Sequence, residues 1–130
     1  MNLLLDTQTL LWWRAANRRL GRRGRQTIED GAATVCVNAA SIWEIAIKSA
    51  IGKVRLRDPV AWAPDVLERQ GFRMLNVTVV HAAAVAGLPQ HHADPFDRLL
   101  IARAHLEQLI IVTSDSAFDR YDVKTLDSRT

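Results

Sequence analysis

The chain has 130 residues, of which 48% are hydrophobic and 24% are charged, and its formal net charge is +3. These values indicate one globular domain spanning residues 1–130 and argue against a disordered chain. The single cysteine, Cys36, excludes an internal disulfide, the first residues do not form a secretory signal, and no apolar stretch has membrane-spanning length. We therefore expect a soluble protein of the reducing cytoplasm, with no membrane partner.

Short apolar or β-branched runs alternate along the chain with segments whose apolar residues recur at helical spacing. In chain order, the predicted elements are a strand at 3–5, helices at 9–16 and 25–30, a strand at 34–37, helices at 41–51 and 58–70, a strand at 74–77, helices at 80–86 and 94–108, and strands at 109–112 and 121–126. Strands that alternate with helices predict a central parallel sheet covered by helices on both faces, which is a three-layer α/β/α domain.

The tryptophans and the cysteine bear on the predicted core. Trp43 and Trp62 lie in predicted helices among apolar neighbours, and Cys36 lies in an apolar strand, so all three are predicted to be buried. Trp12 and Trp13 are adjacent on one short helix, so both can hardly face the core. Either one of them is exposed at a dimer or partner surface, or both are partly buried at the edge of the core.

Four acidic residues recur at one kind of position, the end of a strand or the first turn of a helix: Asp6, Glu44, Asp97 and Asp115. In parallel α/β sheets, the edge formed by the carboxyl ends of the strands carries the active site. If the helices that hold Glu44 and Asp97 begin at that edge, all four carboxylates converge there.

Each acid also has a purely structural explanation. Residues 41–44 have the form of a capping box, with Ser41 as N-cap and Glu44 reaching back to the backbone. Asp94 could likewise cap the helix that starts at Pro95, with Asp97 favoured by the helix dipole. The two acids at strand ends could cap the short helices that follow them. Spacing alone leaves both explanations open.

The helix face on which two of these acids lie favours a site. Apolar residues follow each acid in line along its helix: Leu100, Ile101 and Ala104 follow Asp97, and Ile47 and Ile51 follow Glu44. A carboxylate on an interior face is costly unless it is compensated, and several carboxylates in one pocket repel one another. A divalent cation resolves both problems, and oxygen-only ligands suit Mg²⁺ or Mn²⁺. Such an ion can activate water and stabilise charge at a phosphoryl group.

Arginines crowd into one segment near the N-terminus: Arg14, Arg18, Arg19, Arg22, Arg23 and Arg25. Such a run fits contact with a polyanion such as RNA or with an acidic partner protein, and it is equally typical of a solvated surface. A basic surface beside an acidic, metal-binding pocket fits a nucleic-acid substrate, because arginines hold phosphates while the metal serves the chemistry.

The pair His91-His92 also suggests a metal site. Adjacent side chains rarely point the same way, and this pair lies in a loop that contains proline and glutamine. We therefore do not expect it to bind a metal.

Four stretches carry a resemblance to a known family: residues 3–7 (LLLDT), 40–48 (ASIWEIAIK), 94–102 (DPFDRLLIA) and 112–115 (VTSD). They are spread across nearly the whole chain, and the third is the most specific. In these stretches the chain resembles the PIN-domain ribonucleases, specifically the VapC-like toxins of type II toxin–antitoxin pairs. It departs from them near Asn38, where that branch would have a serine, and this departure does not touch the acids.

The resemblance assigns roles residue by residue. It implies metal-binding, catalytic acids at Asp6, Glu44, Asp97 and Asp115 and supporting positions at Thr113, Lys48 and Arg98. Asp94 belongs to the same motif and could cap the helix, bind the metal through water, or both. The resemblance implies a PIN-like fold and an Mg²⁺- or Mn²⁺-dependent RNA endonuclease, in which a metal-bound water attacks the phosphate and leaves a 5′-phosphate and a 3′-hydroxyl. It also implies a homodimer and an antitoxin protein that blocks the active site.

Two other classes of function fit parts of the pattern. A Mg²⁺-binding receiver-like signalling domain would have paired acids after the first strand and a lysine after a late strand. Here Asp6 stands alone, and the late strand ends in Thr-Ser-Asp at residues 113–115. A catalytically idle partner-binding domain would have no need of all four acids. The nuclease is therefore the leading hypothesis.

Overall fold

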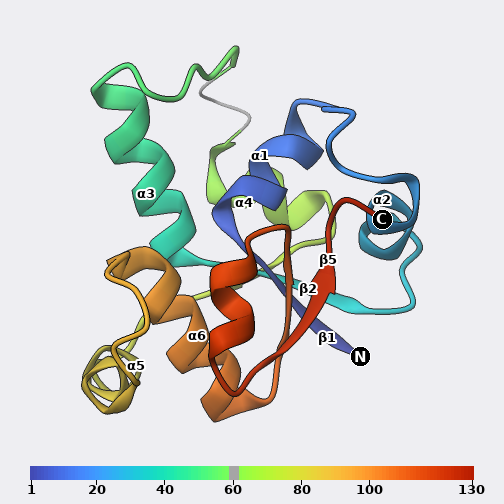
Figure 1. Cartoon of the computed structure of the whole chain (residues 1–130). Helices are drawn as coiled ribbons and strands as arrows, with labels where there is room; N and C mark the ends of the chain where they lie inside the picture. Colours follow the sequence, from blue (N-terminus) through green and yellow to red (C-terminus); the bar gives the residue numbers. More distant parts are fainter. Residues whose placement is uncertain (59–61) are drawn as a thin grey trace.

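The computed structural model describes residues 1–58 and 62–130 (Figure 1). The molecule is built on a five-stranded parallel sheet in the order β3-β2-β1-β4-β5. The strands are β1 (Asn2–Leu5), β2 (Thr34–Asn38), β3 (Arg73–Leu75), β4 (Ile110–Thr113) and β5 (Lys124–Asp127). The chain starts on the central strand, adds β2 and β3 on one side, and later adds β4 and β5 on the other. The strand order therefore reverses between β1 and β4, which is where open parallel sheets bind ligands.

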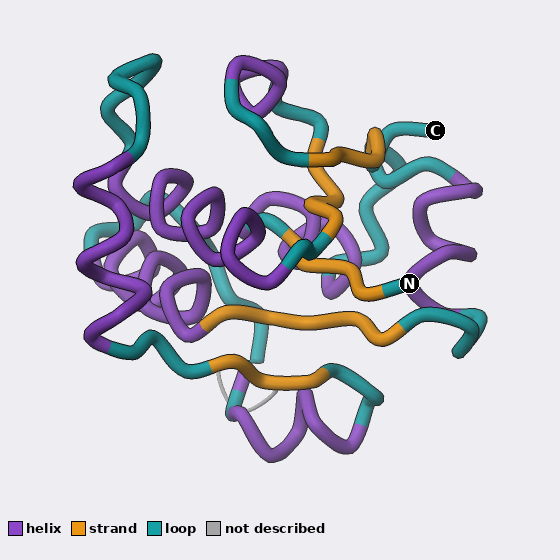
Figure 2. The backbone as a smooth tube through the Cα atoms, turned by 90° about the horizontal axis from the view of Figure 1, so that it is seen from below, coloured by secondary structure: helices purple, strands orange, loops and turns teal. Residues whose placement is uncertain are grey.

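Helices connect the strands and surround the sheet (Figure 2). The α-helices are α1 (Thr7–Arg14), α2 (Arg22–Glu29), α3 (Ala39–Ala50), α4 (Pro64–Arg69), α5 (Val79–Ala84) and α6 (Pro95–Glu107). The described residues also form the short 3-10 helices η2 (Val85–Gly87) and η3 (Ser116–Arg120). Most predicted elements lie within about three residues of these bounds, as expected where helix and strand ends fray. No helix in the described parts of the chain is long and apolar enough to cross a membrane.

Alternate side chains of the sheet enter two cores on opposite faces. Leu3 and Leu5 pack with side chains of α1, α2 and α4, whereas Leu4 and Cys36 pack with α6 and η3. All four side chains are almost completely buried, and burying one leucine contributes about 1.5–3 kcal/mol. The predicted three-layer α/β/α domain and the predicted burial of Cys36 are confirmed.

Helix α3 begins two residues earlier than the sequence pattern suggests. Strand β2 runs directly into the helix, so its last residue, Asn38, serves as the N-cap, and its side chain accepts the Ala40 amide at 2.9 Å. The predicted N-cap, Ser41, lies inside the helix. The capping interpretation of Ser41 and Glu44 is therefore wrong, because the strand ends too close to the helix to leave Ser41 at its start.

The same helix exposes apolar residues that were predicted to be interior. Trp43 is 62% exposed, Ile51 is 61% exposed and Ile47 is 37% exposed, whereas Ile45 is buried. Trp43 packs edge-to-face with Phe96 at a centroid distance of 5.4 Å. The predictions that Trp43 is buried and that Ile47 and Ile51 continue an interior face are wrong, because α3 packs through its other side.

The helix predicted over residues 58–70 is shorter than expected. Helix α4 begins at Pro64, a residue that suits the first helical position. Asp58 is not helical, and residues 59–61 of this prediction lie outside the described residues. Trp62 packs partly buried against the core as predicted.

The adjacent tryptophans of α1 both belong to the core or its edge. Trp12 is buried. Trp13 packs edge-to-face on Phe72 at a centroid distance of 4.8 Å, and its indole N–H donates to Glu29 at 3.0 Å. Of the two alternatives, packing at the edge of the core is therefore the one that the structure supports.

Candidate active site

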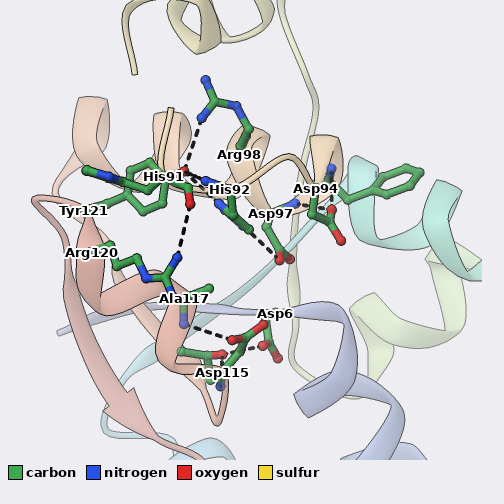
Figure 3. A network of polar contacts seen from close by, with 12 residues as sticks. Asp6, His91, His92, Asp94, Asp97, Arg98, Asp115, Ala117, Arg120 and Tyr121 are labelled. Carbon is green, nitrogen blue, oxygen red and sulfur yellow. Dashed lines mark hydrogen bonds and ion pairs between the residues drawn. The ribbon is translucent and has the colours of Figure 1, made fainter. Parts of the chain in front are cut away.

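A cleft of about 570 Å³ opens beside the carboxyl ends of β1 and β4. Five acidic side chains line it: Asp6, Glu44, Asp94, Asp97 and Asp115. Figure 3 shows Asp97 pointing toward Asp6 and Asp115 across the cleft. The structure thus brings together the four acids that the sequence singled out, with Asp94 beside them and with Lys48 and Lys53 as cationic neighbours.

Asp6 and Asp115 follow two neighbouring strands and are linked through Thr113. The Thr113 hydroxyl donates to Oδ2 of Asp6 at 2.5 Å and accepts the backbone amide of Asp115 at 3.0 Å. Oδ1 of Asp6 accepts the Thr9 amide at 2.8 Å and caps α1, and Oδ1 of Asp115 accepts the Ala117 amide at 2.9 Å. Burial raises the pKa of Asp6 above its ordinary value, and the hydrogen bonds from Thr113 and Thr9 offset this only in part.

Glu44 lies in the second turn of α3, where it is buried and partnered on both oxygens. Oε1 accepts the Thr7 hydroxyl at 2.6 Å, and Oε2 accepts a hydrogen bond from the Lys48 ammonium. The bond to Glu44 in turn raises the pKa of Lys48. Instead of capping its own helix, Glu44 joins α3 to the start of α1 at the floor of the cleft.

Asp94 and Asp97 lie at the start of α6. Oδ1 of Asp94 accepts the amides of Phe96 and Asp97 at 2.9 and 3.0 Å, so Asp94 is the N-cap of the helix. The side chain of Asp97 is 18% exposed, and Nε2 of His92 lies 3.3 Å from its Oδ2. Burial, together with repulsion from the other four carboxylates, raises the pKa of Asp97 to about 7.

This set of side chains fits a hard divalent cation. Its donors are carboxylate oxygens, and their mutual repulsion, seen in the pKa of Asp97, is what a divalent cation relieves. Within residues 1–58 and 62–130, no three His, Cys, Asp or Glu side chains already surround one point as a complete set of ligands. Glu44 is instead paired with Lys48, and Asp97 with His92. A cation such as Mg²⁺ keeps several waters and is usually held by one or two carboxylates, so it does not require a complete protein cage.

Comparison with known protein families matches residues 3–124 to the PIN domain. The chain belongs to the PIN-domain family. This membership in a family of nucleases supports a nuclease and argues against the receiver-like alternative.

Solved structures with the same fold include several toxin–antitoxin complexes. VapBC2 from Rickettsia felis, bound to a DNA fragment from its promoter, is 13% identical with a TM-score of 0.69, covering 98% of this PIN domain and 100% of that chain. FitAB bound to an IR36 DNA fragment is 17% identical with a TM-score of 0.71, and the match covers 98% of this chain and 96% of that chain. DNA-bound VapBC from Salmonella typhimurium is 17% identical with a TM-score of 0.67, covering 98% of each chain. No curated protein sequence matches the chain.

Arg98 lies next to Asp97 in the PIN-domain sequence but points away from the cleft. It is buried, and its guanidinium donates to the Pro89 carbonyl at 2.8 Å, the Tyr121 hydroxyl at 3.2 Å and the Val85 carbonyl at 3.3 Å. Its contacts therefore fix the segment that precedes α6 and do not reach a substrate in the cleft.

The arginines predicted to contact RNA or a partner do not line the acidic cleft in the described chain. Most of them are exposed on α2 and on the loop before it, and α2 lies beside the C-terminus (Figure 1). Arg14 is different, because it lines a second hollow of about 380 Å³ together with Arg55 and Arg57. Leu11 borders both hollows, so this basic hollow adjoins the acidic cleft.

Two residues at the site were not singled out by the sequence. Thr7 donates to Glu44, and its place directly after Asp6 in the family-like stretch was the available signal. His92 contacts Asp97, although the pair His91-His92 was set aside. The two adjacent side chains point differently, because His92 faces Asp97 whereas the ring of His91 packs on Tyr121, and the sequence does not distinguish the two.

Proposed function

We propose that this PIN domain is a metal-dependent endoribonuclease that acts as the toxin of a toxin–antitoxin pair. The observation that carries the proposal is the acidic cleft at the point where the strand order reverses, with a partly buried Asp97 whose pKa is raised to about 7. Burial of Asp6 and Glu44 beside further carboxylates is costly to the fold, and such cost is typical of functional sites. The family-like stretches at residues 40–48 and 94–102 support the toxin branch and RNA as the substrate.

The residues that would hold the metal are Asp6, Glu44, Asp97 and Asp115, with Asp94 as a further candidate. When bound, Mg²⁺ or Mn²⁺ supplies water activation and charge stabilisation at the scissile phosphate. Thr113 orients Asp6 and the backbone of Asp115, and Thr7 orients Glu44. These hydroxyls fix carboxylate oxygens in place before substrate arrives, which reduces the cost of organising the site.

Lys48 has a distinct role in this proposal. Its ammonium contacts Glu44, is partly exposed, and lines the cleft. A lysine is protonated at neutral pH, and the contact with Glu44 raises the pKa of Lys48 further. It is therefore a cation at the cleft wall that can attract a phosphate group when Glu44 turns to a metal.

Exposed apolar side chains support the proposed homodimer. Trp43 and Ile51 on α3, and Val79 and Val80 on α5, are all more than 60% exposed. Both helices pack against α6 and lie on the same side of the molecule (Figure 1). Clusters of large exposed apolar groups mark interaction surfaces. We propose that α3 and α5 form the interface between two copies and that the antitoxin binds over the acidic cleft.

The test is digestion of total cellular RNA by the purified, partner-free protein. Reactions contain Mn²⁺, Mg²⁺ or a chelator, with Asp97→Asn as the test variant. Asp122→Asn is the matched control, because Asp122 is exposed and lies outside the cleft. Discrete fragments with 5′-phosphate ends that require metal and disappear only with Asp97→Asn are expected.

Two results would count against the proposal. Cleavage that persists in the chelator would show that the reaction does not depend on a metal ion. Intact RNA in every reaction, from protein that still binds Mn²⁺, would favour the catalytically idle partner-binding domain instead.

A further inference from the structure

A chain of polar contacts connects the interior of the domain to the acidic cleft (Figure 3). Nη1 of Arg98 lies 3.2 Å from the Tyr121 hydroxyl, which lies 2.7 Å from Nδ1 of His92. Nε2 of the same imidazole lies 3.3 Å from Oδ2 of Asp97. The hydroxyl oxygen of Tyr121 also accepts the backbone amide of His92 at 3.3 Å. Within the described residues, His92 is therefore the link between Tyr121 and the carboxylate.

The direction of each hydrogen bond follows from what each group can do. A guanidinium and a backbone amide can only donate, so both lone pairs of the Tyr121 oxygen are occupied by Arg98 and by the amide of His92. If Nδ1 of His92 carried a hydrogen, it would be a third donor with no lone pair left to accept it. The hydroxyl hydrogen of the buried Tyr121 would then also have no acceptor. Tyr121 must therefore donate to Nδ1 of His92. Nδ1 then carries no hydrogen, and the hydrogen of the neutral imidazole is on Nε2, where it faces Asp97.

The surrounding contacts make this arrangement rigid. Arg98 and Tyr121 are each only 6% exposed. Arg98 also holds the Pro89 carbonyl at 2.8 Å, and Arg120 holds the His91 carbonyl at 3.1 Å. The ring of His91 packs edge-to-face on Tyr121 at a centroid distance of 4.9 Å. The segment before α6 is thus fastened at several points, which leaves the His92 imidazole little freedom to turn.

We propose that His92 is a positioning residue of the acidic cleft: its Nε2–H, fixed as the donor by Tyr121 and Arg98, holds Oδ2 of Asp97 and so aligns the carboxylate for metal binding. This rests on the proposed function for the role of Asp97, but the hydrogen-bond chain itself does not depend on it. The same chain gives a role to Arg98, which is next to Asp97 in the sequence but buried away from the cleft. Arg98 acts on Asp97 through Tyr121 and His92.

Two substitutions at the same position separate positioning from simple packing. The amide nitrogen of glutamine lies close to where Nε2 of histidine lies, whereas that of asparagine lies closer to Nδ1. His92→Gln therefore keeps a donor for Asp97, and His92→Asn keeps polarity but loses that donor. His91→Asn is the matched control, because the His91 side chain contacts the Tyr121 ring without contacting an acid.

The first measurement is the ¹⁵N spectrum of the imidazoles in the full-length, metal-free protein, which identifies the protonated ring nitrogen. We expect the hydrogen of His92 on Nε2, a shift of that nitrogen in Asp97→Asn, and a mixture of both tautomers in Tyr121→Phe. A hydrogen on Nδ1 in the wild-type protein overturns the proposal, whatever the activity.

The second measurement is the affinity for Mn²⁺ by calorimetry. Loss of a group that orients a metal ligand typically lowers affinity about 10- to 100-fold. We expect a loss in that range for His92→Asn, affinity within about threefold of wild type for His92→Gln, and no change for His91→Asn. Equal affinities for His92→Asn and His92→Gln in folded protein overturn the positioning role.

The two proposals can fail separately. If the wild-type protein binds no Mn²⁺ and cleaves no RNA, the nuclease fails, and the imidazole spectra alone decide whether His92 holds Asp97. If RNA is cleaved but the tautomer is reversed, the nuclease stands and the positioning role of His92 is overturned.

Discussion

Removal of the negative charge at Asp97 should make the metal-free protein more stable while it abolishes activity. The carboxyl lies in a cleft with four other carboxylates, and its pKa is raised from 3.8 to about 7. A raised pKa means that the folded protein keeps a proton which the unfolded chain releases. The free energy of unfolding therefore falls as the pH rises from 3.8 to about 7 and stays low above that range.

The size of this effect follows from the shift. Each pKa unit corresponds to about 1.4 kcal/mol, so the full shift of Asp97 amounts to about 4 kcal/mol at most. Solvent at the mouth of the cleft screens part of this repulsion. The favourable interaction of a first-turn carboxylate with the dipole of α6, about 0.3–1 kcal/mol, is also lost in the variant. We expect Asp97→Asn to raise the free energy of unfolding by about 2 kcal/mol at pH 8.

The assay is urea unfolding in chelator at about pH 4.5, 6 and 8, with wild type, Asp97→Asn and the control Asp122→Asn. The gain in Asp97→Asn should shrink as the pH falls toward 3.8, because the wild-type carboxyl is then protonated in both states. Added Mn²⁺ at a hundredfold excess over Kd should stabilise the wild type by about 2.7 kcal/mol and the variant by much less. A destabilised Asp97→Asn at pH 8, or a difference that does not vary with pH, would refute the reasoning and favour a purely structural Asp97.

Three further predictions address the surroundings of the cleft. Thr113→Val should lower the free energy of unfolding by about 1–3 kcal/mol in chemical denaturation and reduce RNA cleavage, because the buried Asp6 carboxylate and the Asp115 amide lose the hydroxyl. The double variant Arg14→Ala, Arg55→Ala should weaken binding of an uncleaved RNA. The slope of log affinity against log salt concentration should also fall, corresponding to about one to two fewer ions released on binding. Arg23→Ala should change neither the affinity nor the slope. Val80→Glu should convert a dimer to a monomer in sedimentation velocity without loss of helical circular dichroism, and an unchanged sedimentation coefficient would place the dimer contact elsewhere.

Most of the fold could be predicted because its strands are short apolar runs separated by helical patterns. Leu3, Leu4 and Leu5 are buried on both faces of the sheet, which is the pattern expected for a central parallel strand. The failures in predicting burial lie on α3, where Trp43 and Ile51 are apolar but exposed. Periodicity reports which side chains avoid water, and it does not distinguish the core of one domain from a surface that another chain covers.

The acidic site could be predicted only as a set of residue types at one sheet edge. Its internal partners depend on contacts between distant segments, such as Thr7 with Glu44 and Thr113 with Asp6. A sequence window around Glu44 contained a convincing capping box, yet the residue that caps α3 is Asn38. Local patterns compete for the same backbone amides, and the position where β2 ends decides among them.

Capping and the proposed metal binding are not rival explanations for these acids, because each acid has two carboxylate oxygens. Asp6, Asp94 and Asp115 each cap a helix through Oδ1, and each also lines the cleft. In a parallel sheet the strands end where the next helices begin, so a capping acid at that edge is automatically near the others. The cap fixes one carboxylate oxygen against the backbone and sets the direction of the second. Under the proposed function, an acid held in this way is already oriented for a cation, so the hydrogen bonds that start the helices would also prepare the site.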